Sequence, residues 1–290
     1  MAASAAAPAS SAKEALPPIL TSTSEQPPLF DGTTRLYMGY FCPFSQRAWV
    51  TRNFKGLQEE IKLVAIHVQD KPAWYKEKVY PKGTDRKNVL TALIPIVMYR
   101  LPKAGHAYAW LLYRTVPSLE HNNKINGESL DLIKYIDSNF RGPALLPEDP
   151  AKRQFADELI AFADSFTKAL YSPLMSHVEM SEEAVAALDK IEAALSKFND
   201  GPFFLGQFSL ADIAYVTILE RVQIYYSHVR NYDITNGRPN LDKFIREMNK
   251  IEAYTHTKYD PMFLLDLAKK HLKMSDCVES EDVGQGLACQ

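Results

Sequence analysis

Hydrophobic residues recur along the chain with two different periodicities, and the change between them predicts two structural parts. In the first part, short apolar runs that suit strands alternate with segments of helical spacing. The predicted strands span residues 35–39 and 61–67, and the predicted helices span 43–54 and 73–79. This order favours a parallel pair of strands joined by a right-handed crossover. Pro43 is placed to begin the first helix, because the first helical turn needs no N–H from it.

A hairpin and a further helix complete the first part. Residues 115–121 predict a strand whose proline lies where no ladder bond is needed, and Asn122-Asn123 predicts the turn into a return strand at 124–126. Residues 128–140 then predict an amphipathic helix. The proline-rich segment 142–150 predicts a domain boundary.

Beyond that boundary, apolar residues recur at steps of three and four almost throughout. The predicted helices span residues 151–170, 181–198, 209–229, 241–251 and 259–274. Ser209 and Asp212 form the pattern of a capping box, which predicts the start of one of these helices. The predicted organisation is a flexible leader over 1–28, a first domain over 29–142, a helical domain over 150–275 and a flexible tail over 276–290.

Composition narrows the class of protein. The 290 residues carry a formal charge of −2 without a basic block, so we expect no nucleic-acid partner. No apolar run reaches the ~18 residues that span a bilayer, so we expect no membrane partner. The histidines show no metal-ligand spacing, and we expect no metal. Three cysteines make a poor disulfide framework and fit a reducing compartment.

The leader bears on localisation. It lacks the basic start and unbroken apolar run of a secretory signal. A plastid transit peptide is also rich in serine, but this leader has no arginine and contains Glu14 and Glu25. We therefore expect a cytoplasmic protein, with the plastid as the less favoured alternative.

One cysteine occupies a position that favours a reactive thiolate. Cys42 lies directly before Pro43, between the first predicted strand and helix, where the helix dipole and open N–H groups favour a thiolate. We therefore expect a lowered thiol pKa, although a small buried residue is the alternative interpretation. Ser45 stands where the second cysteine of a Cys-x-x-Cys pair would stand, so a redox cycle would need an external thiol.

These motifs, taken in order, resemble a known family. Cys42-Pro43-Phe44-Ser45, Val116-Pro117, Glu128-Ser129 and the Ser209/Asp212 cap resemble the cysteine-type cytosolic glutathione transferases. The segments TRNFKGLQEEIKLV, DKPAWYKEKVYP, VPSLEHN and GESLDLIKYID resemble the plant lambda class, which is related to the omega class and to dehydroascorbate reductases. The resemblance covers about residues 29–275. It implies an α/β thioredoxin-like N-terminal domain followed by an all-α C-terminal domain, and a protein that is a monomer.

The resemblance also implies the roles of individual residues. Cys42 would be the catalytic thiolate and would form a mixed disulfide with glutathione, the cosubstrate. Val116, joined to Pro117 by a cis peptide bond, would pair its backbone with the cysteinyl unit of glutathione. Glu128 and Ser129 would hold the γ-glutamyl end, and Lys71 would face the glycyl carboxylate.

Alternatives remain for several of these residues. Lys71 could instead be a loop lysine whose charge is solvated, and Glu128 and Ser129 could form an ordinary N-terminal helix cap. The hydroxyl groups of Tyr37, Tyr40 or Ser45 could activate glutathione in place of Cys42, as in other transferase classes. Helically spaced Phe162, Phe166, Leu170 and Tyr171 fit either a substrate site or the core.

An insertion interrupts the resemblance. Residues 83–114 stand where the family has only a few residues, and their apolar pattern shows no clean period. They fit a lid over the cleft, an apolar flap that binds a partner or a membrane surface, or translated sequence from a retained intron. We favour the last, because the family segments resume on either side. The insertion precedes the strand that should carry Val116, so a shift in register would remove the glutathione site.

Three functions therefore compete. The first is a glutathione-dependent thiol transferase that deglutathionylates small aromatic compounds such as flavonoids through Cys42. The second is a carrier of flavonoid-like ligands without turnover. The third is an inactive splice form in which residues 83–114 disturb the site.

Overall fold

The strands form one mixed sheet at one end of the molecule. The computed structural model describes residues 14–79, 116–176, 180–198 and 200–272. The strand order is β2-β1-β3-β4. The strands are β1 (Thr34–Met38), β2 (Ile61–Ala65), β3 (Ser118–His121) and β4 (Lys124–Asn126). β1 pairs in parallel with β2 and antiparallel with β3, and β3 pairs antiparallel with β4, which confirms the predicted parallel pair and hairpin.

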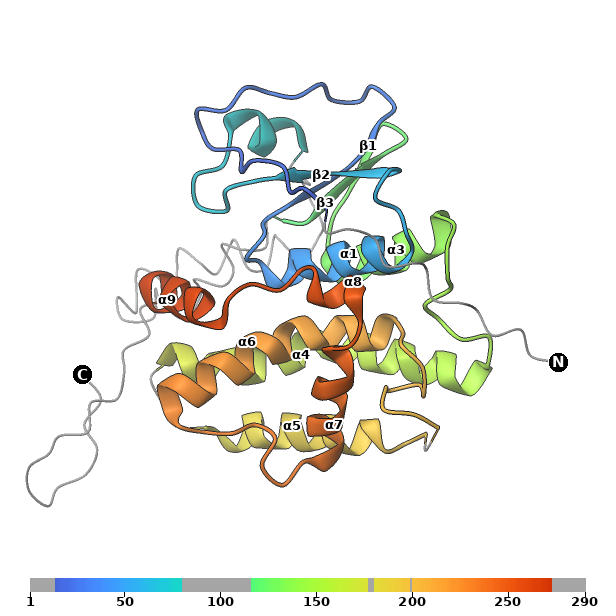
Figure 1. Ribbon diagram of the computed structural model, residues 1–290, viewed down its shortest axis with the longest axis vertical. Helices are drawn as coiled ribbons and strands as arrows, with labels where there is room; N and C mark the ends of the chain where they lie inside the picture. Colours follow the sequence, from blue (N-terminus) through green and yellow to red (C-terminus); the bar gives the residue numbers. More distant parts are fainter. Residues whose placement is uncertain (1–13, 80–115, 177–179, 199, 273–290) are drawn as a thin grey trace, which may run out of the picture.

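Two helices cover one face of this sheet. α1 (Pro43–Phe54) and α3 (Ser129–Asn139) lie between the sheet and the helices below it (Figure 1). Alternate residues of β1 point to opposite faces, as strand geometry requires. Leu36 and Met38 pack with Trp49 of α1 on one face, while Tyr37 packs with Trp74 and the short helix η1 (Tyr75–Val79) on the other.

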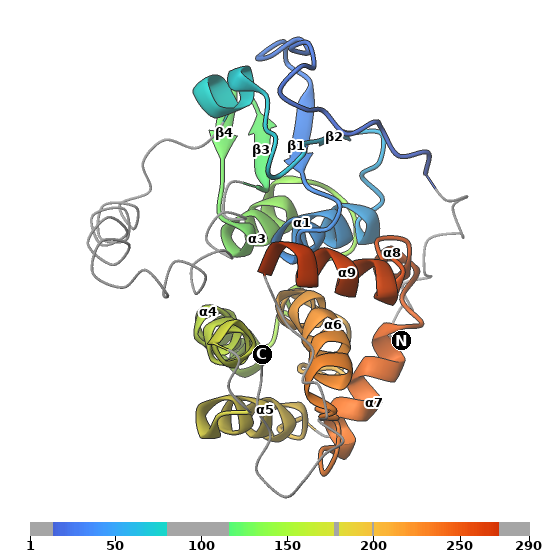
Figure 2. The ribbon, with the colours of Figure 1, turned by 90° about the vertical axis from the view of Figure 1, so that its left-hand side faces the viewer.

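The remaining helices form the second part, which Figure 2 shows from the side. They are α4 (Pro150–Ser176), α5 (Glu182–Leu195), α6 (Leu210–Arg230), α7 (Pro239–Met248), α8 (Glu252–Thr255) and α9 (Pro261–Leu272). α4 continues past the predicted end at 170 and through Pro173, and α8 was not predicted because four residues carry no periodicity. Among the described helices, none is both long and apolar enough to cross a membrane.

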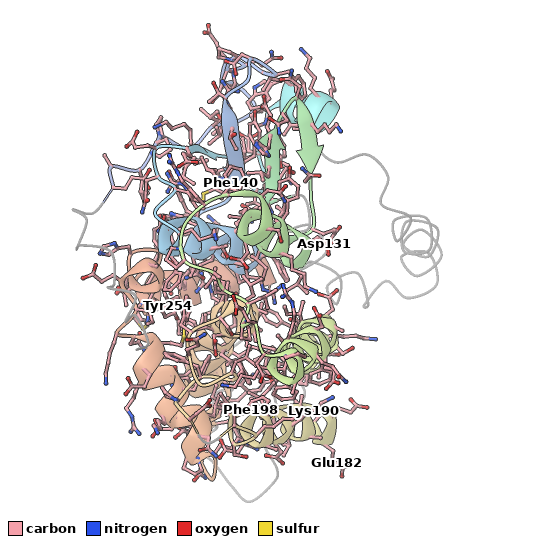
Figure 3. All side chains as sticks on the ribbon, turned by 90° about the vertical axis from the view of Figure 1, so that its right-hand side faces the viewer. Asp131, Phe140, Glu182, Lys190, Phe198 and Tyr254 are labelled. Atoms are coloured by element: carbon pink, nitrogen blue, oxygen red, sulfur yellow. The ribbon has the colours of Figure 1, made fainter. Side chains whose placement is uncertain are left out.

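α6 is buried on nearly all sides, with α1 and α4 packed against it, and α5 packs against α4 and α7 in the same hydrophobic cluster. Outward-facing positions are polar: Asp131 of α3 and Glu182 and Lys190 of α5 are exposed (Figure 3). Each large apolar side chain buried in this cluster stabilises the fold by about 1.5–3 kcal/mol. The helical part is therefore held by an ordinary apolar core, as its periodicity predicted.

α1 is buried by both parts, and its polar side chains are buried with it. Gln46 donates to a carboxylate oxygen of Glu220 in α6 (3.2 Å) and to the hydroxyl of Thr257 (3.0 Å). Arg47 donates to the carbonyl oxygen of Ala214 (2.7 Å). Buried polar groups need such partners, because desolvation without one is costly. These bonds tie the sheet-containing part to the helical part.

The described part of the leader, residues 14–28, makes specific contacts with the first domain. Leu20 forms a parallel bridge beyond β2: its N–H donates to the carbonyl oxygen of Ala65, and its carbonyl oxygen accepts from the N–H of His67. Glu14 accepts two hydrogen bonds of 2.7 Å from the buried guanidinium of Arg52. Leu20 therefore extends the sheet at the otherwise open edge of β2, and Glu14 holds the segment to α1.

The predicted helix start at Ser209 is confirmed. The Asp212 carboxylate accepts from the Ser209 N–H (2.8 Å) and also from the Phe204 N–H (3.0 Å), so it closes both the cap and the preceding loop. The insertion over 83–114, the tail over 276–290 and the cysteines Cys277 and Cys289 lie outside the described residues.

Candidate functional site

Cys42 lies at the amino end of α1, as predicted. β1 ends at Met38, and Cys42 is the N-cap residue with extended backbone (φ −83°, ψ 118°). The turn between them is tight: the Cys42 N–H donates to the Gly39 carbonyl oxygen (3.1 Å), and the Gly39 N–H donates to the Ser45 hydroxyl (3.1 Å). A Cβ at Gly39 would lie 2.6 Å from Cγ2 of Val68, so a larger residue here would force the Val68 side chain to shift. The sequence thus fixes the thiol at the junction of strand and helix.

The structure brings Cys42 together with Val116 and Pro117. The Cys42 sulfur lies 4.0 Å from the Val116 carbonyl oxygen, at the limit of a thiol hydrogen bond. The Val116-Pro117 peptide bond is cis, which confirms the prediction. Both residues directly precede β3, so the pairing of β3 with β1 holds them beside the thiol.

The predicted lowering of the thiol pKa is wrong for this buried state. Burial among Tyr37, Ile66, Tyr75 and Val116 raises the pKa of Cys42, because a thiolate is poorly solvated there. Several groups oppose this effect: hydrogen bonds from the Ser45 backbone and hydroxyl and from the Phe44 backbone, and then the charge of Arg221, each lower the pKa. The helix terminus does favour the anion, but desolvation outweighs it.

Lys71 lies near the thiol, and Glu128 directly precedes Ser129 at the start of α3. Lys71 is partly buried; burial and the neighbouring Lys76 lower its pKa, while the negative charge of a Cys42 thiolate would raise it. Glu128 is exposed and precedes α3 with φ +60°, ψ 112°, a conformation that residues other than glycine rarely adopt. Backbone strain of this kind is concentrated at functional sites.

Ser129 is the first residue of α3 and is buried. Its hydroxyl accepts a hydrogen bond of 3.1 Å from Nη1 of Arg47. Arg47 is 1% exposed, and burial lowers its pKa to about 10, so it remains charged at neutral pH. A fixed cation therefore lies between the starts of α1 and α3.

The hydroxyl alternatives to Cys42 have other partners. The Tyr37 hydroxyl donates to the Glu120 carboxylate (2.6 Å), and the Tyr40 hydroxyl donates to the Pro17 carbonyl oxygen (2.5 Å). Burial raises the pKa of both tyrosines, which keeps both hydroxyls neutral. Ser45 supports the thiol rather than replacing it. Phe166 and Leu170 are fully buried core residues, so they do not line an open substrate surface.

Sequence reasoning missed Arg47, Glu220 and Arg221. All three are buried, and a sequence pattern assigns charged residues to the solvent side of a helix. The sequence held one indication of buried charges: Glu220 and Arg221 interrupt an otherwise apolar stretch of α6. An interruption of that kind is typical of a buried ion pair.

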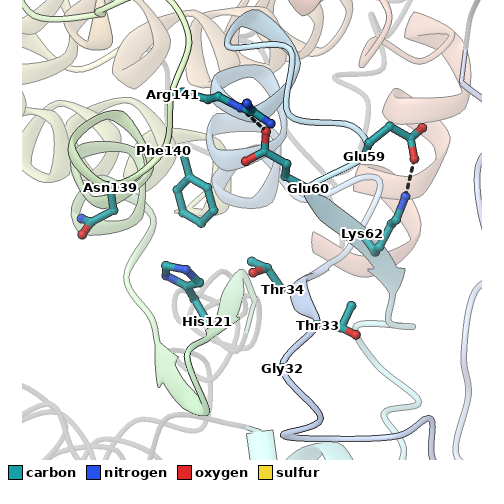
Figure 4. Close-up of a pocket in the computed structure, with 10 residues that line it drawn as sticks. All are labelled: Gly32, Thr33, Thr34, Glu59, Glu60, Lys62, His121, Asn139, Phe140 and Arg141. Atoms are coloured by element: carbon teal, nitrogen blue, oxygen red, sulfur yellow. Dashed lines mark hydrogen bonds and ion pairs between the residues drawn. The ribbon is translucent and has the colours of Figure 1, made fainter.

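A separate pocket of about 420 Å³ lies at the opposite end of the sheet (Figure 4). Thr33 and Thr34 line it at the amino end of β1, whereas Cys42 follows the carboxyl end of that strand. Ion pairs between Arg141 and Glu60 and between Lys62 and Glu59 border it. This pocket is therefore distinct from the Cys42 site. In the part of the chain that the structure describes, no group of three or more His, Cys, Asp or Glu is placed to bind a metal ion.

Comparisons with known proteins agree with this geometry. Residues 41–139 match the glutathione S-transferase N-terminal domain, and residues 177–247 match the C-terminal domain. The chain is 68% identical over 273 residues to Protein IN2-1 homolog A of Oryza sativa subsp. japonica, covering 94% of this chain and 100% of that protein. It is 49% identical over 254 residues to glutathione S-transferase L3 of Arabidopsis thaliana, covering 88% of this chain and 94% of that protein.

Among solved structures, glutathione transferase Omega 1C of Trametes versicolor superposes with a TM-score of 0.63 at 20% identity, covering 83% of this chain and 97% of that one. This likeness confirms the predicted fold of a thioredoxin-like domain followed by a helical domain. The chain belongs to the glutathione S-transferase family.

Proposed function

We propose that this protein is a lambda-type glutathione-dependent thiol transferase that acts through Cys42. The Cys42 thiolate attacks the glutathione sulfur of a small glutathionylated compound, and a disulfide forms between Cys42 and glutathione. The bond between that sulfur and the compound breaks, and the compound leaves with the electron pair as the reduced anion, which takes a proton from solvent. A second glutathione thiolate then attacks the mixed disulfide, which releases oxidised glutathione and restores the Cys42 thiolate. Small aromatic compounds such as flavonoids are the proposed substrates.

The remaining site residues are proposed to hold glutathione. The Val116 backbone pairs with the cysteinyl unit, which aligns the two sulfurs for in-line attack. Ser129 and the amino end of α3 bind the γ-glutamyl carboxylate, supported by the positive charge of Arg47. Glu128 binds the γ-glutamyl ammonium, and Lys71 binds the glycyl carboxylate.

The observation that carries this proposal is the position of the Cys42 thiol at the amino end of α1, 4.0 Å from the Val116 carbonyl oxygen. The position of Ser45, one helical turn from Cys42, excludes an internal Cys-x-x-Cys disulfide. The relative named glutathione S-transferase L3 supports the lambda assignment. We further propose that the protein acts as a monomer in the cytoplasm.

Mass spectrometry after incubation with oxidised glutathione tests the proposal. We expect one glutathione adduct, on Cys42, which reduced glutathione removes. Cys42→Ser abolishes the adduct and the turnover, whereas Ser138→Ala, at an exposed position of α3, leaves both unchanged. Full turnover by the Cys42→Ser protein would overturn the assignment.

A second candidate is a ligand carrier, favoured by one observation. The Cys42 thiol is fully buried and its pKa is raised, which suits an inert thiol. A carrier would bind an aromatic ligand such as quercetin with equal affinity in wild type and Cys42→Ser, and would form no glutathione adduct. The adduct experiment therefore separates the two functions.

A further inference from the structure

Arg221 of α6 has hydrogen-bond donors to which the proposed transfer reaction assigns no role. Its side chain is 1% exposed. Nη1 donates to the carboxylate of the adjacent Glu220, but Nε and Nη2 have no hydrogen-bond acceptor among the described residues. Nε and Nη2 form one edge of the planar guanidinium group, and two parallel N–H donors on such an edge match a carboxylate.

Contacts between helices place this guanidinium near the thiol. Glu220, which Arg221 contacts, accepts a hydrogen bond from Gln46 of α1. The Gln46 N–H in turn donates to the carbonyl oxygen of Cys42 (3.0 Å). The charge of Arg221 also lowers the pKa of Cys42, so the two groups are electrostatically coupled. Arg221 thus lies on the helical-domain side of the reacting sulfur.

The surrounding groups leave this region positively charged. Glu220 lies between two cations, because its second oxygen is 3.8 Å from the ammonium group of Lys258. Tyr171 and Tyr254 face Arg221, but burial raises the pKa of each well above its usual range, so both hydroxyls stay neutral. One carboxylate therefore faces two cations, and an additional anion would be stabilised.

Aromatic rings border the same region. Tyr171 of α4 and Tyr225 of α6 contact each other edge to face, with centroids 6.4 Å apart. Both are more than nine-tenths buried. A flat aromatic group whose acidic substituent reaches the Arg221 edge would pack against these two rings once their side chains shift to admit it.

Together these observations carry an inference that rests on the proposed function. We propose that the Nε/Nη2 edge of Arg221 binds a carboxylate on the part of the substrate that leaves when Cys42 takes the glutathionyl group. The enzyme would therefore prefer glutathionylated aromatic acids. Binding of this carboxylate holds the leaving group in place while Cys42 attacks the glutathione sulfur. Arg221 is a specificity-determining residue in this scheme and does not exchange a proton.

Two matched substrates test the inference: the mixed disulfides of glutathione with 4-mercaptobenzoate and with 4-mercaptobenzamide. They differ in charge but hardly in shape. We expect wild type to show a kcat/KM ratio in favour of the benzoate of about tenfold or more, in line with hydrogen bonds to charged groups. Arg221→Met brings the ratio close to one, and Arg221→Lys keeps part of it. Arg141→Met, at an exposed position of the opposite end, retains the wild-type ratio.

The double variant Glu220→Gln/Arg221→Met covers the case in which Arg221→Met fails to fold, because it leaves no unpaired buried carboxylate. A binding measurement separates this inference from the proposed function. Calorimetry of Cys42→Ala with benzoate and benzamide should show a preference for benzoate that Arg221→Met removes. Equal binding and equal kcat/KM in wild type would overturn the inference. Preferential benzoate binding without any Cys42 adduct would support the anion site and overturn the transferase.

Discussion

Nη1 of Arg47 lies 3.1 Å from the hydroxyl oxygen of Ser129, and this bond joins the starts of α1 and α3. If both residues act on the γ-glutamyl carboxylate through this bond, their effects on glutathione affinity should not add. We expect Arg47→Met and Ser129→Ala each to weaken binding about tenfold, and the double variant to weaken it by much less than the product. Calorimetry with S-methylglutathione measures the affinity of wild type, both single variants and the double variant.

Replacing Arg47 should also change the free energy of unfolding of the protein. Burial lowers the pKa of Arg47 to about 10, so the fold bears a cost for the charge. Arg47→Met relieves that cost, but it leaves the buried Ala214 carbonyl oxygen and the Ser129 hydroxyl without their donor. We therefore expect Arg47→Met to lower the free energy of unfolding by about 1–3 kcal/mol. A loss of stability with unchanged affinity for glutathione would mean that Arg47 is purely structural.

The backbone of Glu128 makes a second prediction. Its φ of +60° with ψ of 112° favours glycine, so Glu128→Gly should stabilise the protein by about 1 kcal/mol. The same change removes the proposed partner of the γ-glutamyl ammonium and should weaken glutathione binding. Asn123→Gly, at φ +57° in the hairpin, is the matched control and should leave affinity unchanged. Equal affinities of both variants would remove Glu128 from the site.

The burial of Cys42 makes a third prediction, on pH dependence. Burial raises the pKa of the thiol, so alkylation by iodoacetamide should have its midpoint above the ~8.5 of an ordinary thiol. Ser45 opposes this effect, and Ser45→Ala should move the midpoint still higher. Peptide mass spectrometry distinguishes Cys42 from the other two cysteines. A midpoint well below 8 would contradict the dominance of desolvation.

The sign of the associated stability change follows from the same shift. The unfolded thiol ionises first as the pH rises, so the contribution of Cys42 is fully present below about pH 8.5 and is lost at higher pH. Cys42→Ala should therefore lose less stability than wild type between pH 8 and pH 10.

Much of the fold could be predicted from patterns that act locally. Pro43 and Gly56 mark the two ends of α1, where Gly56 has φ +71°. The short apolar run of Leu36, Tyr37 and Met38 predicted β1, and the Ser209/Asp212 spacing predicted the start of α6. Each of these depends on a few neighbouring residues, so single-sequence reasoning was sufficient.

The remainder depends on contacts between distant segments. Gln46 and Arg47 have the composition of a solvent face but are buried, because α6 and α8 cover α1 from the second domain. The pKa of Cys42 likewise depends on burial by residues that precede and follow it at long range. Leu20 pairs with β2 only because that strand has an open edge. No local pattern encodes these relationships.

The packed leader makes a fourth prediction. The Leu20 N–H donates to the Ala65 carbonyl oxygen over 2.8 Å, so Leu20→Pro should reduce the free energy of unfolding by about 1–3 kcal/mol. Leu20→Val keeps both the N–H and an apolar side chain and should have little effect. Denaturant unfolding measures the difference. Equal stability of both variants would show that residues 14–26 contribute nothing to the sheet.

Asp212 carries the last prediction. Burial raises its pKa to about 7, although hydrogen bonds from Ser209 and Phe204 oppose the shift. The folded protein therefore binds a proton that the unfolded chain releases near pH 4, and the contribution of Asp212 is fully present below that pH and lost as the pH rises through 7. Relative to Asp212→Asn, wild type should lose roughly 1.4 kcal/mol per pH unit between pH 4 and 7. Asp242→Asn, at a partly exposed position of α7, is the control, and denaturant unfolding across this range measures the stability of all three proteins. A difference that does not vary with pH would mean that the backbone donors keep the carboxylate ionised despite its burial.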